Sequence, residues 1–349
     1  MWIRKAIILL LSFWLFWSCA GKDDQNKKKT DQKAQVTDTV QLRIDSLSSL
    51  IRETPKEDTL FYQRSQYQLM KGDVRNAVND LEIAQKLNPE QPQYYLDLAD
   101  LELRRGESGV AKNLLEECHK KFPKNVEAMV RLANIYMAVE QYKEARTYLI
   151  KASRVEPENP RLYLLSSMIF QQIGDVENAI EDLYNAIKYD PNYYDAHVML
   201  GLISARQGKE IAIDHYMNAM RIDPDNPEAA YNLGMYYQGN EQFDKAIETY
   251  RSGLDEMDST HQHFLFNLGY ILESFKSNPD SAVHYYQKVI EHYPEDYRAF
   301  YRMGLCYEEL DKVQKAMASY DMCLKVNPDF DPAYNALSRL SEQYNKQRQ

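Results

Sequence analysis

Two pairs of histidines are the first residues in this sequence whose spacing could serve metal or acid–base chemistry. His261 and His263 are separated by one residue, and His284 and His292 lie eight residues apart. On a helix the first two side chains would diverge by about 200°, so they would not converge on one ion. The second pair shares a helix face but has tyrosines as neighbours, which favours packing. We therefore predict no metal site.

The cysteines and the glycines give no catalytic pattern either. The four cysteines, Cys19, Cys118, Cys306 and Cys323, form no CxxC pair and no zinc-type spacing. A disulfide between Cys306 and Cys323 stays open as an alternative in an oxidising compartment. The sequence contains no GxGxxG, GxxxxGK, GxSxG or HExxH motif, and its carboxylates single out no acid–base pair. We expect neither an enzyme nor a cofactor.

Cys19 differs from the other cysteines because it ends an apolar run. Arg4 and Lys5 precede the almost entirely apolar residues 6–17. As a helix this run would rise roughly 18 Å, well short of the roughly 30 Å of hydrocarbon in a bilayer. A positive start followed by a short apolar segment is typical of a cleaved secretory signal. We predict a signal peptide over residues 1–18.

The residues at the predicted cleavage point resemble the lipobox of bacterial lipoproteins, in which a new N-terminal cysteine carries acyl chains. Ser18 and Cys19 fit that pattern, whereas Phe16 and Trp17 are bulkier than its usual residues. The resemblance implies lipid attachment at Cys19 and a place in the bacterial cell envelope, as an outer membrane lipoprotein that faces the periplasm or the surface. The alternative is a short anchor whose Cys19 stays an inert thiol.

The segment after Cys19 lacks apolar periodicity, so residues 19–39 are predicted to form a disordered tether. Its Lys22, Asp23 and Asp24 resemble the short acidic signal of surface lipoproteins in the Bacteroidota phylum, although a solvated charge cluster would look the same. The whole chain is acidic, with 52 Asp and Glu against 42 Lys and Arg. Such a surface repels nucleic acid and anionic lipid, so acyl chains would have to hold the protein at a membrane.

A period of about 34 residues runs through the rest of the chain. Prolines mark it at Pro89, Pro123, Pro157, Pro191, Pro224, Pro294 and Pro328. An alanine precedes each proline by twelve residues, at Ala77, Ala111, Ala145, Ala179, Ala212, Ala282 and Ala316. Further upstream a small residue recurs, at Ser65, Ala99, Ala133, Ser167, Gly201, Gly234, Gly269 and Gly304. Helices approach closely only where neither carries a bulky group, so each period predicts two packed helices.

This pattern strongly resembles the tetratricopeptide repeat family, because aromatic, small and proline positions recur in phase. The resemblance implies an all-α fold, a right-handed α-solenoid of about eight helix-turn-helix repeats over residues 58–330. The repeats fall at 58–91, 92–125, 126–159, 160–193, 194–226, 227–260, 261–296 and 297–330.

Both ends of such an array need a cover, because an open end would expose a core face. Apolar residues recur at helical spacing before the first repeat, at Val40, Ile44, Leu47 and Ile51. They predict a leading helix over residues 40–57, and residues 331–349 are predicted to form a capping helix with a polar outer face.

The sixth and seventh repeats depart from the pattern. Asp258 stands where the sixth repeat would carry its proline, and the seventh repeat is two residues longer than 34. We expect a local bend or looser stacking over residues 255–280.

In this family the first helix of each repeat lines a concave groove that holds partner segments. The family's ligand-facing positions, carried over by phase, are Tyr62, Gln66, Leu96, Asp100, Asn134, Met137, Leu164, Met168, Leu202, Tyr231, Met235, Tyr270, Tyr301, Leu305 and Glu308. Such a wall suits an extended or helical segment with apolar anchors, although some of these side chains could merely fill gaps between helices. Asn134, Asn232 and Asn267 lack the lysines of the family's carboxylate clamp, so chaperone tails are disfavoured.

These observations favour a noncatalytic scaffold for protein–protein interaction, lipid-anchored in the bacterial envelope, whose groove binds other envelope proteins. Two alternatives stay open. One is a surface lipoprotein that binds glycans or nutrients, for which the 27 tyrosines give faint support. The other is an enzyme with a site near the irregular sixth and seventh repeats. The sequence leaves the partner, the membrane leaflet and the oligomeric state undetermined.

Overall fold

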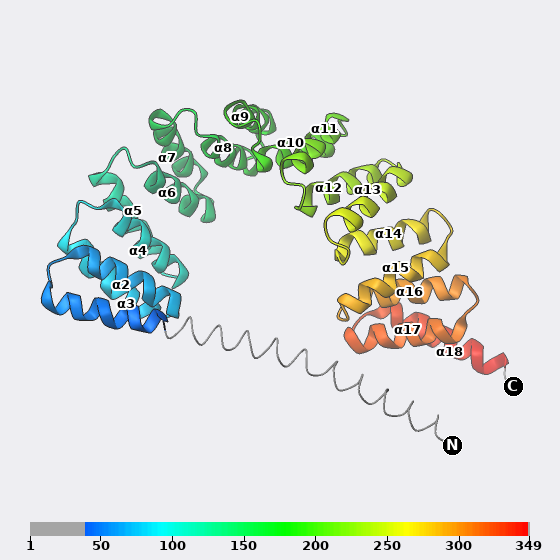
Figure 1. The fold of residues 1–349 in the computed structure, drawn as a ribbon. Helices are drawn as coiled ribbons and strands as arrows, with labels where there is room; N and C mark the ends of the chain where they lie inside the picture. Colours follow the sequence, from blue (N-terminus) through cyan, green and yellow to red (C-terminus); the bar gives the residue numbers. More distant parts are fainter. Residues whose placement is uncertain (1–38, 348–349) are drawn as a thin grey trace, which may run out of the picture. The chain divides into compact units, whose positions relative to one another are not determined.

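The computed structural model describes residues 39–347, which form helices joined by turns (Figure 1). The predicted signal peptide, the predicted lipid-attachment residue Cys19 and the predicted tether up to residue 38 lie outside the described residues. Within residues 39–347, no helix combines the length and the apolar character needed to cross a bilayer. The predicted all-α solenoid class is confirmed.

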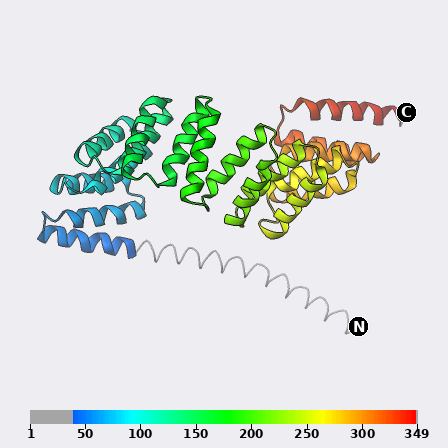
Figure 2. The same cartoon turned by 90° about the horizontal axis from the view of Figure 1, so that it is seen from above.

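A leading helix over residues 39–53 is followed by eight antiparallel helix pairs and a final helix, which Figure 2 shows from above. The helices are α2 (Asp58–Lys71), α3 (Val74–Leu87), α4 (Pro92–Arg104), α5 (Ser108–Lys121), α6 (Val126–Ala138), α7 (Tyr142–Val155), α8 (Pro160–Gln172), α9 (Val176–Tyr189), α10 (Tyr194–Arg206), α11 (Ile211–Ile222), α12 (Pro227–Gly239), α13 (Phe243–Glu256), α14 (Gln262–Ser274), α15 (Pro279–His292), α16 (Tyr297–Glu309), α17 (Val313–Val326) and α18 (Asp331–Gln347). Each pair occupies one of the predicted repeats.

The chain divides after Pro157 into two compact parts. The N-terminal part holds the leading helix and the first three repeats. The C-terminal part holds the other five repeats and α18.

The turn between the two helices of a repeat requires a left-handed residue. Gly72 takes a φ of 84° and ends α2, and the side chain of Asp73 then accepts a hydrogen bond from the Asn76 backbone N–H at the start of α3. Glu140 and Asp311 hold the same conformation in other repeats, with φ of 59° and 55°. A non-glycine residue in this region costs roughly 1 kcal/mol, so the packing of the two helices imposes the turn.

The core of the last four repeats is built on small residues that face large ones. A glycine of the first helix lies against a tyrosine ring of the second helix in the pairs Gly201–Tyr216, Gly234–Tyr250, Gly269–Tyr286 and Gly304–Tyr320. We call these the Gly–Tyr pairs. Their tyrosines are at most 1% exposed. The first four repeats carry alanine or serine in place of the glycine, and leucine in place of the tyrosine.

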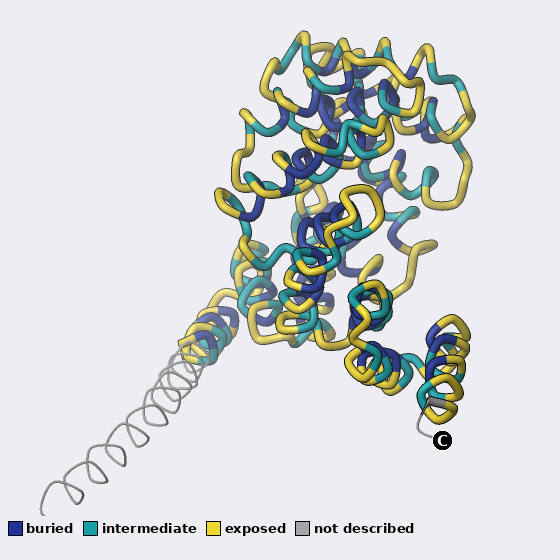
Figure 3. The backbone as a smooth tube through the Cα atoms, turned by 90° about the vertical axis from the view of Figure 1, so that its right-hand side faces the viewer, coloured by how far each residue is buried: buried dark blue, intermediate teal, exposed yellow. Residues whose placement is uncertain are grey.

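The expectation of looser stacking over residues 255–280 is wrong. One buried cluster runs from Ala230 on α12 to Leu340 on α18, and buried positions, dark blue in Figure 3, continue along the helices. Tyr250 and Phe264 are fully buried on either side of the irregular turn, with ring centroids 5.8 Å apart. The helices stay packed because Gly253 leaves room for the Phe264 ring, whose Cε2 would lie 2.3 Å from a Cβ at Gly253.

The leading helix covers the first repeat, as its apolar stripe predicts. Leu47 and Ile51 are at most 9% exposed, and Ile51 packs against Phe61 of α2. The helix ends at residue 53 rather than at the predicted residue 57. Pro55 explains this difference, because proline disfavours helix in the residue before it.

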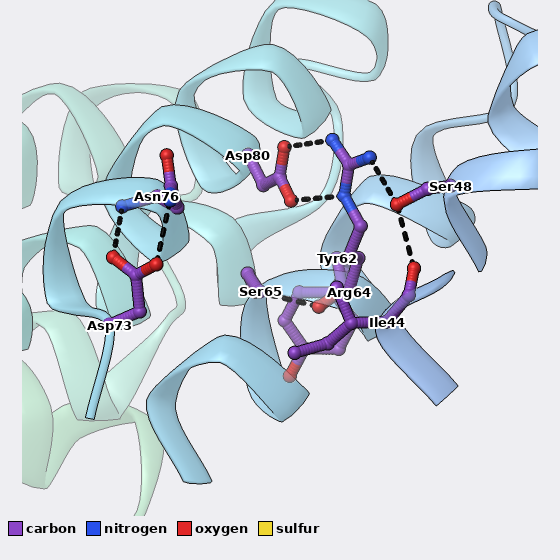
Figure 4. Close-up of polar contacts among 8 residues, drawn as sticks. All are labelled: Ile44, Ser48, Tyr62, Arg64, Ser65, Asp73, Asn76 and Asp80. Carbon is purple, nitrogen blue, oxygen red and sulfur yellow. Dashed lines mark hydrogen bonds and ion pairs between the residues drawn. The ribbon is translucent and has the colours of Figure 1, made fainter. Parts of the chain in front are cut away.

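An arginine also ties the leading helix to both helices of the first repeat (Figure 4). Arg64 on α2 donates from Nε and Nη2 to the two carboxylate oxygens of Asp80 on α3, at 2.7 Å each. Its Nη1 donates to Ser48 Oγ of the leading helix at 2.9 Å. Asp80 is 1% exposed, so this ion pair is shielded from water.

At the other end of the array, α18 covers the eighth repeat. Ala333, Ala336 and Leu340 on α18 are buried. Arg339 Nη2 donates to both carboxylate oxygens of Glu308 on α16, at 2.9 and 2.7 Å. The predicted capping helix over residues 331–349 thus corresponds to α18, and residues 348–349 lie outside the described residues.

Candidate partner-binding surface

Within each part of the chain, the first helices of successive repeats are bonded to one another. In the N-terminal part, Arg131 on α6 donates to the Leu96 carbonyl at 2.8 Å and pairs with Asp100 at 2.7 Å, both on α4. In the C-terminal part, Arg302 on α16 pairs with Glu273 on α14 at 3.2 Å. We call the row of first helices in each part the first-helix surface.

Leu96 adds nothing to the first-helix surface of the N-terminal part. It was predicted to face a partner, but it is 4% exposed and lies in the core between α4, α5 and α6. Asn134 is exposed and Met137 is half-buried on α6, so both can be reached.

Tyr62 and Asp100, also predicted for this surface, are each held by a neighbour. The Tyr62 ring lies 5.1 Å from that of Tyr94, and burial together with Asp97 raises the pKa of Tyr62. Burial also raises the pKa of Asp100, and the Arg131 guanidinium opposes this shift.

In the C-terminal part, two methionines of the surface are exposed. Met168 on α8 is 38% exposed and Met235 on α12 is 41% exposed. The Asn267 amide nitrogen lies 3.4 Å from the Met235 sulfur. Tyr231 is half-buried, with its ring 5.3 Å from that of His263 on the next first helix. A thioether beside tyrosine rings forms an adaptable apolar surface.

On α14 and α16 of this surface, tyrosine rings pack against a neighbouring side chain and stay partly exposed to solvent. The Arg302 guanidinium lies 4.7 Å from the centre of the Tyr270 ring. The Tyr301 ring lies 5.1 Å from that of Phe330, and Leu305 is half-buried on the same helix, α16. Each of these side chains keeps part of its surface exposed to solvent.

The other residues predicted to face a partner differ in burial. Leu164 is buried, whereas Gln66, Leu202 and Glu308 are half-buried.

Behind the surface, the buried tyrosines enter a repeated hydrogen-bond network. The Tyr286 hydroxyl donates to Glu273 at 2.7 Å, and Glu273 also accepts from Arg302 at 3.2 Å. Burial, with the nearby carboxylate, raises the pKa of Tyr286. The arrangement recurs one repeat later in Tyr320, Glu308 and Arg339. We call it the tyrosine–acid–arginine network; Glu273 joins the seventh repeat to the eighth, and Glu308 joins the eighth repeat to α18.

The sixth repeat carries an uncharged version of this network. Gln238 takes the place of the acid and accepts from the Tyr250 hydroxyl at 3.5 Å. Asn267 takes the place of the arginine and donates to the same hydroxyl at 3.1 Å.

The histidine pair at 261 and 263 has structural contacts. His261 is the N-cap of α14, where its Nδ1 accepts from the Phe264 N–H at 3.4 Å. Burial, followed by the proximity of His263, lowers the pKa of His261. His263 lies against Tyr231. Among residues 39–347, no three His, Cys, Asp or Glu side chains are placed to hold one metal ion.

The buried cysteines are free thiols. Cys118, Cys306 and Cys323 are fully buried, and the disulfide considered between Cys306 and Cys323 is not formed. Burial raises the pKa of Cys306 to about 12 and that of Cys323 to about 11. These thiols pack as small apolar groups.

Sequence reasoning did not predict that polar residues join neighbouring first helices. Arg131, Asn267 and Arg302 are each the sixth residue of their helix, and Asn232 holds the same place in α12. Their common phase was a signal that could have identified them. The family's ligand-facing residues lie at other positions of the first helix, so the sixth residue was not considered as a link between helices.

The comparisons with known proteins agree with this architecture. Models of the tetratricopeptide repeat match residues 62–117, 106–169, 160–193, 215–248, 264–296 and 297–330. The chain is therefore a tetratricopeptide repeat protein.

Two relatives are similar to part of the chain. The type IV pilus assembly protein PilF of Pseudomonas aeruginosa is 30% identical over 139 residues, which cover 38% of this chain and 53% of that protein. The BBSome complex member bbs-4 of Caenorhabditis elegans is 23% identical over 179 residues, which cover 50% of this chain and 38% of that protein. Both matches span less than two thirds of the relative.

A solved structure supports the fold. The C-terminal part of a TPR repeat-containing protein from Cytophaga hutchinsonii aligns with a TM-score of 0.59, over 71% of this chain and 99% of that one. Its sequence identity is 18%, so this likeness concerns the fold alone.

Proposed function

We propose that the protein is a noncatalytic scaffold that binds segments of partner proteins on its first-helix surface. The observation that carries this proposal is the run of partly exposed apolar side chains on consecutive first helices, from Tyr231 and Met235 to Tyr270 and Tyr301. A fully structural role would bury them, as it buries the tyrosines of the Gly–Tyr pairs. Rings with a polar tip and flexible thioethers suit extended or helical segments.

The names of the two relatives agree with a scaffold. One is named for pilus assembly and the other as a member of a complex, so both names refer to assemblies of several proteins. A repeat array suits such a role because stacked repeats present an extended surface without a reactive centre.

A charge placed on the first-helix surface tests this proposal. Met235→Lys should remove the partners that copurify with the full chain after crosslinking, because an ammonium would be buried without a counter-charge. Met322→Lys is the matched control, since Met322 is 40% exposed on α17, a second helix. Equal loss, or equal retention, of partners in both variants would contradict partner binding at this surface.

We also propose that acyl chains on Cys19 anchor the scaffold in the bacterial envelope. The support is the positive start, the short apolar segment and Ser18-Cys19 in the sequence. Growth with an alkyne-bearing fatty acid should label the protein, and Cys19→Ala should lose both the label and the membrane association. A Cys19→Ala protein that kept both would rule out this anchor.

A further inference from the structure

An open pocket of about 360 Å³ lies between the fifth and sixth repeats, bounded by α10, α11 and α12. The residues that matter for its chemistry are Leu202, Ala205, Arg206, Tyr216, Asn232 and Met235. Leu202 and Met235 belong to the first-helix surface, so the pocket opens beside the proposed partner site. None of the residues that line it is acidic.

A comparison between repeats shows what this pocket lacks. The residue four positions after the glycine of the Gly–Tyr pair is Glu273 in the seventh repeat and Glu308 in the eighth. These carboxylates accept from their tyrosine hydroxyls at 2.7 and 2.6 Å. In the fifth repeat the corresponding residue is Ala205, which cannot accept a hydrogen bond through its side chain. No residue within 39–347 accepts from the Tyr216 hydroxyl in its place.

The next position carries a positive charge in the fifth repeat. Arg206 stands where the seventh and eighth repeats have Ser274 and Glu309. Arg206 and Tyr216 both line the pocket. Burial raises the pKa of Tyr216 to about 12, and the Arg206 guanidinium opposes that shift. Asn232 occupies the phase from which Asn267 donates to a tyrosine hydroxyl in the next repeat. A hydroxyl, a guanidinium and an amide therefore surround the space that a carboxylate fills elsewhere.

We propose that this pocket receives the carboxylate of an aspartate or glutamate side chain from the bound partner segment. That carboxylate would accept from the Tyr216 hydroxyl and the Arg206 guanidinium, as Glu273 accepts from Tyr286 of its own repeat and from Arg302 of the next repeat. Leu202 and Met235 would contact the apolar part of the same segment. This inference rests on the proposed function and names the partner chemistry: a segment with an acidic side chain beside an apolar one.

Titration with a small probe tests the pocket without knowledge of the partner. N-acetyl-glutamate amide carries only a side-chain carboxylate, and N-acetyl-glutamine amide is its neutral match. With ¹³C-methyl methionine in the full chain, the Met235 signal should shift saturably with the glutamate probe and stay in place with the glutamine probe. N-acetyl-alanine, with only a terminal carboxylate, should bind more weakly. Equal shifts with the glutamate and glutamine probes, or no shift, would overturn the proposal.

Two variants sharpen the test. Arg206→Gln removes an exposed charge and should weaken binding of the glutamate probe about tenfold, which corresponds to the loss of one charge-assisted hydrogen bond. Ala205→Glu supplies the missing carboxylate from the chain itself, so it should abolish binding and raise the melting temperature. Ala205→Gln is the neutral control for size. Unchanged binding in both Arg206→Gln and Ala205→Glu would contradict the assignment.

The two proposals fail separately. If Met235→Lys removes the partners but the glutamate probe binds nowhere near Met235, only the acidic preference is wrong. If the probe binds but neither Met235→Lys nor Arg206→Gln affects the partners, the pocket is real and the proposed role of the first-helix surface is wrong.

Discussion

Replacement of Gly234 by alanine should destabilise the protein, although alanine is the better helix former. The new Cβ would lie 2.2 Å from Tyr250 Cε1 and 2.6 Å from Cζ, well below ordinary contact distances. Tyr250 is fully buried and its hydroxyl is bonded to Asn267, so the ring cannot swing away. Overpacking costs typically about 1–3 kcal/mol, and a contact this short lies at the upper end. The gain in helix propensity, about 1 kcal/mol, leaves a net loss of about 2 kcal/mol.

A double-mutant cycle separates the clash from other effects. Tyr250→Leu alone should cost about 2–4 kcal/mol because it leaves a cavity. The double variant recreates the alanine and leucine that the second repeat carries at Ala99 and Leu115. The clash is then absent, so the two changes should offset each other by about 2 kcal/mol. Gly109→Ala is the control, because nothing lies within 4 Å of a Cβ at that helical position.

The assay is urea unfolding followed by circular dichroism, with hydrogen exchange of α12 and α13 to detect local opening in a repeat array. Gly234→Ala should lower the unfolding midpoint, whereas Gly109→Ala should leave it equal or higher. If Gly234→Ala proves as harmless as Gly109→Ala, or if the cycle is additive, the steric account of the Gly–Tyr pairs is refuted.

Three further outcomes are expected. Asp80→Ala leaves the Arg64 guanidinium without its partner and should cost about 3–5 kcal/mol, with faster hydrogen exchange in the leading helix; unchanged exchange there would contradict the role of the ion pair. Burial, followed by the proximity of His197, lowers the pKa of His215 in the folded chain. The unfolded chain therefore binds a proton more readily, and the free energy of unfolding should fall as the pH drops below about 6.5. His215→Phe should reduce this dependence between pH 8 and pH 5.5; an unchanged slope in urea unfolding would exclude His215 as its source. Because burial raises the pKa of Cys306 to about 12, mass spectrometry after iodoacetamide treatment should find that thiol unmodified until urea unfolds the chain, and modification in the native state would show that it is accessible.

The repeat pattern was sufficient to predict the helix pairs. Alanines such as Ala77 and Ala145 are fully buried where two helices cross, and prolines such as Pro160 and Pro227 start the next first helix. These features depend on close helix packing and on the fixed backbone angle of proline, so the same residue types recur at the repeat period in the sequence.

Exposure on the first helices was harder to predict, because it depends on the next repeat. Leu96 has a ligand-facing phase, yet α6 packs over it and Arg131 bonds to its carbonyl. The close packing across the sixth and seventh repeats was also missed, since Gly253 was not recognised as the space for the Phe264 ring. The exchange of Ala–Leu or Ser–Leu pairs for Gly–Tyr pairs between the first and the last four repeats could be read from the sequence. Alignment of the same repeats also places Ala205 at the position of Glu273 and Glu308.

Site-specific photocrosslinking in cells tests the central claim, that partner segments bind on the first-helix surface, most directly. A photoreactive phenylalanine analogue at Met235 on α12 would be compared with the same analogue at Met217, which is 57% exposed on the second helix α11. The account predicts discrete adducts from position 235, which Arg206→Gln weakens, and none from position 217. Adducts from position 217 alone, or equal adducts from both positions, would contradict it.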